Sequence, residues 1–530
     1  MGCRTSKAQV AHPQGHRQVA GHHPKPYCAA AGRRPGPCIA HEFLSRAFGA
    51  FIDGKFRHLK RLFNQLPDLR KAERCRYTPA EFAWTLLLMF LGRMGSRNQM
   101  DAQRNSGALP EAVAWFAGRA HDDIPADGQR RVSCSDNIVR FLKTLPPRCL
   151  EEIQLAIVKG LFESRLFDGS RVFGNYQRII IDGSVREKCR EGFEEGGKAN
   201  GGGRYRYVLQ ASLLLCGHPI PLMQEHIDVD DPVSEKEDCE INAARRLLPR
   251  LKAAFPRMSF IVLGDSLYAC RPVAAVCSRL GWRFCFTFKE GRTPAVWQEA
   301  MALMDAAPEN ALSYRDKPDA DSACRRSRLR WAQDIDFSEK EDGSLVVTAI
   351  EQRETHKGAE TRYAWISDVP RINCGNVTLL VDATGRERHP IEDMFNTLKN
   401  NGIGMEHVFC ANATASKNLY SLMQIAFMLW TLFHHGLLRR ICAWAGTWSQ
   451  VAIAKSLLEG LPKPPKHRRQ KSAGGMSRSG LGSPRGGRSV RRGSGISSRW
   501  PFGIAGRLTS FLRKRPESGI VSADEAATIS

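Results

Sequence analysis

The sequence lacks the cysteine patterns of a disulfide-rich or zinc-binding protein. It has 16 cysteines in 530 residues, but none form a Cys-x-x-Cys pair and no Cys/His group has the spacing of zinc ligands. Scattered thiols are typical of a reducing compartment, which predicts a cytoplasmic protein. The N-terminal residues include Arg4 and Lys7 but no apolar segment follows them, so the sequence indicates no secretory signal.

Long apolar runs are also scarce. The most apolar stretch extends from Leu419 to Leu438, and Gln424, His434 and His435 interrupt it. Its length would suit a membrane span, but these polar side chains favour a helix buried in a protein core. We therefore expect no association with a membrane.

Acidic residues are almost missing from the two ends of the chain. Residues 1–40 contain six Lys or Arg and no Asp or Glu, and residues 461–530 contain fifteen Lys or Arg against three acids. These ends account for +18 of the formal net charge of +24. Both are rich in small and polar residues and lack hydrophobic periodicity, so we expect disordered basic tails. Their charge favours a polyanionic partner.

Between the tails the composition is that of a globular protein, and residues 41–165 are predicted to be helical. Thr78-Pro79-Ala80-Glu81 is a capping box with proline at the first helical position, and the apolar run 82–91 follows it. The polar, basic sequence after Leu91 suits a turn into a second helix. The segment is either a small helical DNA-binding domain or a solvated helical surface. The side chains expected to face outward are those of Arg93, Arg97 and Arg104.

Residues 170–440 have the pattern of a mixed α/β domain. Apolar, β-branched segments alternate with amphipathic ones in the order β-β-β-α-β-α-β, with the first three strands in a meander. The expected strands are 178–182, 205–216, 219–227, 260–265 and 282–288, and the expected helices are 234–254 and 271–280. Three more strands, 329–337, 344–352 and 361–369, predict a β insertion at about 312–375. A helix that opens at His389-Pro390 and a long apolar helix over 415–438 complete the domain.

Three carboxylates of this domain are candidates for catalysis. Asp182 and Asp265 each end an apolar strand, and Glu392 lies in the first turn of the helix that opens at Pro390. Acids at the ends of buried strands are costly unless something uses them, and adjacent strand ends can bring them to one edge of a sheet. Oxygen ligands without Cys or His favour two Mg²⁺ ions, with Mn²⁺ as the alternative, about 4 Å apart for phosphodiester chemistry. Alternatively, each is an ordinary strand-end or helix N-terminal acid, as we interpret the acidic run 228–238.

Basic residues near these acids are candidates for contact with DNA. Lys399 lies two turns from Glu392, beside an apolar helix face formed by Ile391, Met394, Phe395 and Leu398. We expect its ammonium group in an open cleft where a phosphate backbone would lie. Lys289, at the end of the fifth strand, is either a phosphate contact or a solvated strand end.

These segments resemble a bacterial insertion-sequence transposase with a DDE triad on an RNase H-like fold. Ile181-Asp182-Gly183-Ser184 and Gly264-Asp265-Ser266-Leu267-Tyr268 are similar to the segments that carry the two aspartates of that family. The family signature Tyr-x2-Arg-x3-Glu-x6-Lys matches at Arg388, Glu392 and Lys399, with Gly385 in the place of the tyrosine. A β insertion before the glutamate is another feature of the family.

The resemblance implies a DNA transposase. Asp182, Asp265 and Glu392 would bind two Mg²⁺ ions, water would cut DNA at the ends of an insertion sequence, and the 3′-hydroxyl would then attack target DNA. Arg388 and Lys399 would hold DNA phosphates. The implied partner is double-stranded DNA, the implied working unit is a homodimer that pairs two ends, and the implied location is the cytoplasm, on the nucleoid. Alternatives are a non-transposing metal-dependent nuclease and an inactive DNA-binding remnant.

Overall fold

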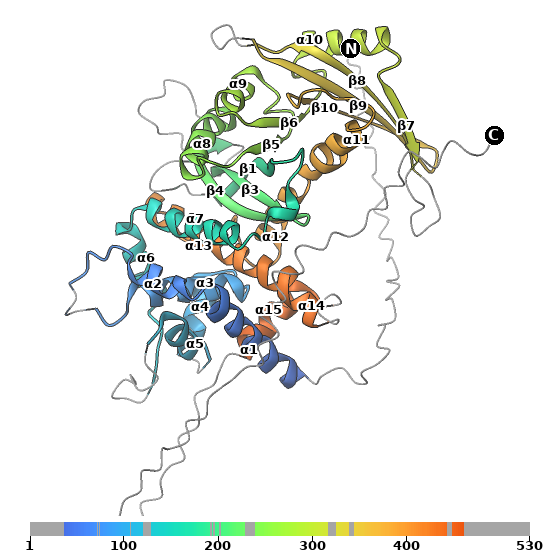
Figure 1. Ribbon diagram of the computed structural model, residues 1–530. Helices are drawn as coiled ribbons and strands as arrows, with labels where there is room; N and C mark the ends of the chain where they lie inside the picture. The colour runs from blue at the N-terminus through green and yellow to red at the C-terminus, as the bar shows by residue number, and fades with distance from the viewer. Residues whose placement is uncertain are drawn as a thin grey trace, which may run out of the picture.

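Figure 1 shows the computed structural model, which describes residues 37–460 apart from eleven gaps. The gaps are residues 72, 74, 106–107, 120–128, 191–192, 194–196, 201–202, 228–238, 316–324, 339–343 and 443–447. Both predicted tails lie outside the described residues, except that residues 37–40 begin the first helix. The tail predicted over 1–40 is therefore too long by four residues, because Pro37 is accommodated at a helix start.

Helices form the N-terminal part of the described chain, as the sequence predicts for residues 41–165. They are α1 (Pro37–Lys55), α2 (His58–Asn64), α3 (Pro79–Leu91), α4 (Arg97–Gln103), α5 (Ala108–Ala117), α6 (Ser135–Thr144) and α7 (Pro147–Glu163). α3 begins at the predicted capping box. The Thr78 hydroxyl accepts a hydrogen bond from the Glu81 amide (3.2 Å), and the Glu81 carboxylate accepts one from the Thr78 amide (2.7 Å). All but the first residue of α3 is buried, so this helix is central to the layer.

A helix from the far end of the chain lies against these N-terminal helices. α13 (Ala413–Thr431) continues through the π-helical turns η5 (Leu432–Leu438) into α14 (Arg439–Ile441). It packs on α3, α6, α7 and strand β4 (His218–Ile227), and α15 (Gln450–Glu459) packs on α1. Its length and composition would suit a membrane span, but 89% of its most apolar 18-residue window is buried inside the protein. The buried helix predicted for this stretch is confirmed.

The remaining elements build a mixed α/β arrangement around one sheet, in which the described residues supply ten strands. In spatial order the strands are β2 (Lys198–Asn200), β3 (Gly203–Leu215), β1 (Gln177–Cys189), β5 (Phe260–Gly264), β6 (Arg283–Thr287), β10 (Ala359–Ser367), β9 (Val346–His356), β8 (Arg326–Asp336) and β7 (Ala311–Arg315), and β4 pairs with β3. β1, β3 and β4 form the predicted antiparallel meander. β1, β5 and β6 run parallel to one another.

The β insertion extends this sheet, because β10 pairs antiparallel with β6. The sequence pattern predicts β8, β9 and β10 but neither β7 nor α10 (Pro294–Ala306). β7 has only five residues and none of them is fully buried, so the alternation of half-buried Leu312 and Tyr314 with the exposed residue after each is too short to predict a strand. Figure 1 shows α10 lying over the insertion strands, at the end of the molecule opposite the N-terminal helices.

Helices cover both faces of the sheet. Asp182 of β1 pairs with Gln210 of β3, whose side-chain oxygen accepts a hydrogen bond from Tyr420 of α13 (3.0 Å). The next residue, Gly183, lies against Glu240, the first residue of α8 (Glu240–Ala254). Because successive strand residues point to opposite faces, α8 and α13 cover opposite faces. α9 (Arg271–Arg279) packs beside α8.

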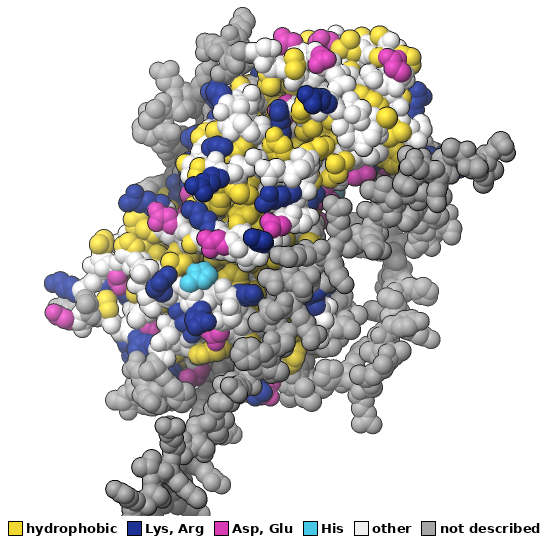
Figure 2. All heavy atoms as spheres, in the orientation of Figure 1, with side chains coloured by type: hydrophobic (Ala, Val, Ile, Leu, Met, Phe, Trp, Pro, Cys, Tyr) yellow, Lys and Arg dark blue, Asp and Glu magenta, His cyan; other side chains and the backbone are white. Residues whose placement is uncertain are grey.

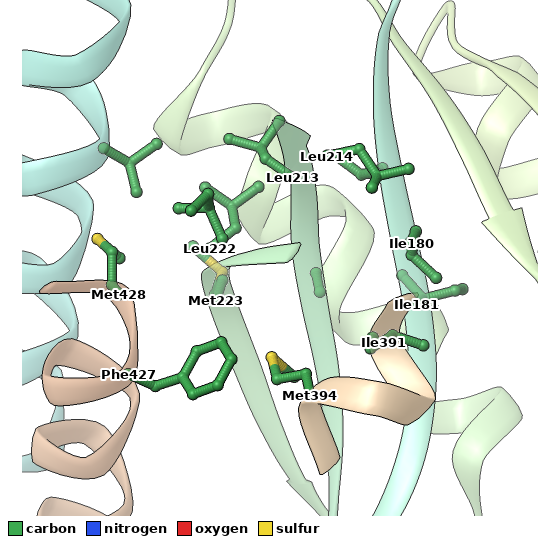
Figure 3. Close-up of a cluster of buried hydrophobic side chains, with 14 of the residues drawn as sticks. Ile180, Ile181, Leu213, Leu214, Leu222, Met223, Ile391, Met394, Phe427 and Met428 are labelled. Carbon is green, nitrogen blue, oxygen red and sulfur yellow. The ribbon is translucent and has the colours of Figure 1, made fainter. Parts of the chain in front are cut away.

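α12 (Pro390–Asn400) packs on strands β1 and β4. It follows three short turns, α11 (Val377–Leu380), η3 (Val381–Gly385) and η4 (Arg386–Arg388). Its buried residues are those of the predicted apolar face, Ile391, Met394, Phe395 and Leu398. In Figure 3, Met394 lies beside Phe427 of α13 and Met223 of β4. The apolar packing of this face leaves Glu392 on the part of the helix that is directed away from the core.

Candidate active site

Asp182 lies inside strand β1 and not at its end. The sequence predicts that the strand stops at Asp182, but β1 continues to Cys189 because this segment stays paired with β3. What does end here is the parallel pairing with β5, whose last registered pair is Ile180 with Leu263. Asp182 therefore lies two residues beyond the shared part of the two strands, at the edge of the sheet where β5 ends.

Asp265 follows β5 directly, as predicted. If the parallel register is continued by two positions from Ile180 and Leu263, Asp182 and Asp265 stand opposite each other. Neighbouring strands are about 4.8 Å apart, so the two carboxylates share one edge of the sheet. The Asp265 carboxylate also accepts a hydrogen bond from the Leu267 amide (2.8 Å), which fixes the turn after the strand.

The electrostatic environment of Asp182 joins the candidate residues into one site. Burial raises the pKa of Asp182 to about 7. The positive charge of Arg388 opposes this rise, and the negative charges of Asp265, Glu240 and Glu392 add to it. A carboxyl group that is buried among other carboxylates holds its proton because ionisation in this setting is unfavourable. The pattern indicates a site that is short of positive charge.

Glu392 reaches this site from α12, but its carboxylate is engaged with neighbours on its own helix. One oxygen of the Glu392 carboxylate forms an ion pair with Arg388, and the other lies 2.8 Å from Nδ1 of His389. The side chain is 40% exposed. Glu392 is therefore accessible and already has an ion-pair partner, whereas Asp182 is half-buried and has no ion pair with any residue that the structure describes.

The two predicted lysines differ in their surroundings. Lys289 is exposed just after β6, on the same sheet edge as Asp265, because β5 and β6 are parallel. The two loops are also linked, since Arg292 donates a hydrogen bond to the Leu267 carbonyl (3.2 Å). The sequence predicts that the Lys399 ammonium group is free in an open cleft, and this prediction is wrong. The Nζ atom of Lys399 lies 3.1 Å from the Glu406 carboxylate, so it is half-buried in an ion pair.

Gly385 stands where the family signature has a tyrosine, and the packing around it leaves no room for a side chain. A Cβ atom at this position would lie 2.7 Å from Cε2 of Trp365 in β10. Carbon atoms that are not bonded to each other do not approach this closely, so a tyrosine at this position would have to displace the indole ring of Trp365. The backbone of η3 is thus held against the insertion sheet where the family signature has a large aromatic residue.

Glu240 is a fourth carboxylate whose charge acts on Asp182, although it lies at the opposite face of the sheet, and the sequence pattern does not predict it. It lies against Gly183, where a Cβ atom would collide with the carboxylate, and it accepts a hydrogen bond from the Tyr268 hydroxyl (2.8 Å). Burial raises its pKa, the Tyr268 hydrogen bond lowers it, and the charge of Asp265 raises it further. The glycine after Asp182 was the available signal, because a residue without a side chain admits a close neighbour. The acidic run 228–238 that precedes Glu240 lies outside the described residues.

These acids do not form a complete coordination shell. Across the parts of the chain that the structure describes, no three His, Cys, Asp or Glu side chains are arranged to hold one metal ion. The engagement of Glu392 with Arg388 and His389 is one reason, since both partners draw its carboxylate toward themselves. What the arrangement offers is a half-buried carboxyl group, Asp182, on which the charges of three further acids and one arginine act.

The arginines predicted to form a DNA-binding helical surface do not share one environment. Arg93 is buried, not exposed, and its guanidinium lies 5.2 Å from the ring centroid of Trp430 in α13. Arg97 forms an ion pair with Asp136 (3.1 Å), and Arg104 is half-buried. The outward orientation predicted for Arg93 is wrong because local sequence does not reveal that α13 covers the end of α3.

Comparison with known proteins assigns this chain to no family. No family model matches it, and no curated protein matches it.

Proposed function

We propose that the chain is a DNA transposase of the DDE type, which cuts phosphodiester bonds at the ends of an insertion sequence and joins the 3′-hydroxyl ends to target DNA. The observation that carries the proposal is the site itself. Asp182 and Asp265 share one sheet edge, and the charges of Glu392 and Arg388 act on Asp182. These are the positions at which the sequence matches the transposase motifs.

The order of the strands supports an RNase H-like fold for this domain. An antiparallel meander of three strands, β1, β3 and β4, is followed by β5 and β6, which run parallel to β1 in the order β4-β3-β1-β5-β6. In this arrangement β1 is central in the domain. Asp182, inside β1, and Asp265, just after β5, lie at the same edge of the sheet. The insertion enters after β6, between Asp265 and Glu392 in sequence, as in the transposases that the chain resembles.

The residues fit a hard divalent cation such as Mg²⁺ or Mn²⁺. Asp182 is largely buried, has no ion pair with any residue that the structure describes, and is surrounded by further oxygen donors. Asp182 and Asp265 would hold the cations together with Glu392, and Glu240 adds a fourth carboxylate nearby. Bound cations would supply the positive charge that activates an attacking hydroxyl and stabilises the leaving oxygen.

Arg388 has two roles in this proposal. In the metal-free protein its guanidinium is the counter-charge of Glu392 and opposes the rise in the pKa of Asp182. If Glu392 held a cation, Arg388 would lose its acidic partner and would be available to a DNA phosphate, for which its planar group is well suited. Lys289 would contact a phosphate at the same edge. Lys399 would have to exchange Glu406 for DNA in a similar way.

The partner in this proposal is double-stranded DNA, bound by a homodimer that pairs two ends on the nucleoid in the cytoplasm. The excess of basic residues supports a polyanionic partner, and Figure 2 shows Lys and Arg side chains spread over the visible face of both the helical part and the sheet. A non-transposing nuclease would use the same acids, and a DNA-binding remnant would keep only the basic surface.

The test is a reaction with the DNA that flanks the gene on both sides. A plasmid that carries both flanks is incubated with the full chain in Mg²⁺, in Mn²⁺ or in EDTA, and the products are sequenced. We expect metal-dependent cuts at the two ends of the element and joined products with short target duplications. Cuts without joining would indicate the nuclease, and binding without cuts would indicate the remnant.

Matched variants connect the activity to the site. Asp182→Asn, Asp265→Asn and Glu392→Gln should each abolish cleavage while DNA binding persists. The control is Asp393→Asn, which removes an exposed carboxylate from the position next to Glu392. Cleavage that survives Asp182→Asn would contradict the proposed site, whatever the DNA substrate.

A further inference from the structure

One face of the β insertion carries a concentration of arginines, which we name the arginine face. The pairing of the strands places these side chains on the same side of the sheet, since directly paired residues point the same way. The arginine face consists of Arg315 of β7, Arg326, Arg328 and Arg330 of β8, Arg353 of β9 and Arg362 of β10. Glu351 and Glu360 are the acids of these strands on the same face.

Three of these arginines form a row across the strands. Arg328 is paired with Arg353, and Arg353 is paired with Arg362. Like charges that face each other directly across strands are destabilising, so such a row is costly for the fold alone. The buried Glu351 offsets part of this cost, because it binds Arg330 at 2.6 Å and Arg362 at 2.5 Å, with Arg353 farther away at 3.5 Å.

The outer part of the arginine face has no such compensation. Arg315, Arg326 and Arg328 are exposed, and none of them has an ion pair with any residue that the structure describes. Arg330 and Arg362, by contrast, serve the fold, since Arg330 also pairs with Asp305 of α10 (2.6 Å) and Arg362 lies over the Trp297 ring. The free charge is therefore at the end of the strands that α10 does not reach.

The end of the insertion strands that carries Arg315, Arg326 and Arg328 extends beyond β5 and β6, at the sheet edge where the candidate active site lies. β10 pairs with β6 over Trp365 to Ser367, and Trp365 is opposite Thr287, the last residue of β6. Arg362 and its row lie beyond that point, and Arg326 is farther out along β8. β6 is parallel to β5, so the edge that these strands overshoot is the edge of Asp265.

We propose that the arginine face binds the phosphate backbone of double-stranded DNA that extends from the candidate active site. This inference rests on the proposed function, because it takes its choice of polyanion from the cleavage site at the same sheet edge. A rigid row of exposed guanidinium groups fits a regular row of phosphates, and it carries no apolar side chains that would insert into a lipid surface. Contacts of this kind supply affinity and orientation without reading sequence.

The experiment compares two triple variants of the full chain that lose the same charge. The first is Arg315→Gln, Arg326→Gln and Arg328→Gln. The control is Arg257→Gln, Arg279→Gln and Arg371→Gln, three exposed arginines at the opposite edge of the sheet, before β5, before β6 and after β10. Binding to a fluorescent duplex is measured by anisotropy over a range of salt concentrations, and the melting temperature of each variant checks the fold.

We expect the first triple variant to bind the duplex at least tenfold more weakly than the control at about 0.1 M salt. The slope of log affinity against log salt should be flatter by about 2 to 3, at about 0.9 for each lost phosphate contact. Equal affinities and slopes for the two variants would overturn the proposal. So would a selective loss of binding to double-stranded RNA or to anionic phosphatidylglycerol vesicles while duplex DNA binding is unchanged.

The outcome separates this proposal from the proposed function. Asp182→Asn should bind the duplex as the wild type does, through an intact arginine face. If the wild type binds DNA through these arginines but never cuts it, the transposase assignment fails and the binding surface stands. If the first triple variant binds and cuts like the control, the transposase assignment stands and the binding surface fails.

Discussion

Replacement of Asp182 by Asn should stabilise the metal-free protein at neutral pH, although it removes a residue that the proposed function needs. The carboxyl group is largely buried, close to three other acids, and burial is the main reason why its pKa rises from 3.8 to about 7. An amide of the same shape has no charge to bury. The substitution therefore separates the stability of the fold from the chemistry of the site.

The magnitude and its sign follow from the two pKa values. Unfolded, the carboxyl group loses its proton near pH 4, and folded it keeps the proton until about pH 7. The folded protein thus holds the extra proton between these values, and the free energy of unfolding falls as the pH rises through this window. Above about pH 7 the carboxyl group is ionised in the folded protein as well, and the whole cost of burying its charge lowers the free energy of unfolding. A pKa difference of this size corresponds to at most about 4 kcal/mol.

The assay is denaturant unfolding of the wild type and the variant in EDTA, at about pH 8 and about pH 5. At about pH 8 the variant should be more stable by up to about 4 kcal/mol, and at about pH 5 by about 1 to 2 kcal/mol. Added Mn²⁺ should stabilise the wild type more than the variant, because the variant lacks one of the carboxylates proposed to hold the cation. Asp393→Asn is the control and should change stability by less than about 0.5 kcal/mol. A variant no more stable than the wild type at about pH 8 would refute the reasoning.

Three further predictions test other parts of the molecule. Glu240→Gln should reduce the rise in melting temperature that Mn²⁺ causes, since this acid adjoins the site, and an unchanged rise would exclude it. Leu398→Ala should destabilise the fold by about 2 to 5 kcal/mol because this side chain is fully buried, whereas Lys399→Ala should cost less than about 1 kcal/mol and weaken DNA binding. Deletion of residues 461–530 should flatten the salt dependence of DNA affinity by several units of slope, and an unchanged slope would show that this segment makes no DNA contact.

The parts of the fold that the sequence predicts are those with a strong local pattern. The start of α3 follows from a capping box of four adjacent residues, and the face of α12 follows from apolar residues at helical spacing. The three-strand meander is likewise visible as apolar runs joined by short turns. β7 escapes prediction because its alternation is limited to two half-buried residues, Leu312 and Tyr314, in a strand of five.

The errors at the site arise where distant segments meet. An acid after three isoleucines predicts a strand end at Asp182, yet pairing with β3 continues the strand to Cys189. Arg93 is buried because α13, more than 300 residues later, places Trp430 beside it. Glu240 belongs to the site through a contact with Gly183 that no spacing within its own helix reveals. Strand ends and helix faces can be predicted locally, but the neighbours of a charge cannot.

The position of α13 has a consequence for the order in which the chain acquires its structure. The ribosome completes α3 at Leu91, but the helix that buries it starts at Ala413, more than 300 residues later. At about 5–20 residues per second, the apolar surface of α3 waits for its partner for roughly 15 to 60 seconds. The N-terminal helices therefore cannot reach their final packing during their own synthesis, and we expect the face of α3 that contacts α13 to stay exposed until α13 has been made. A chain that stops before α13 would leave this face of α3 without the helix that covers it.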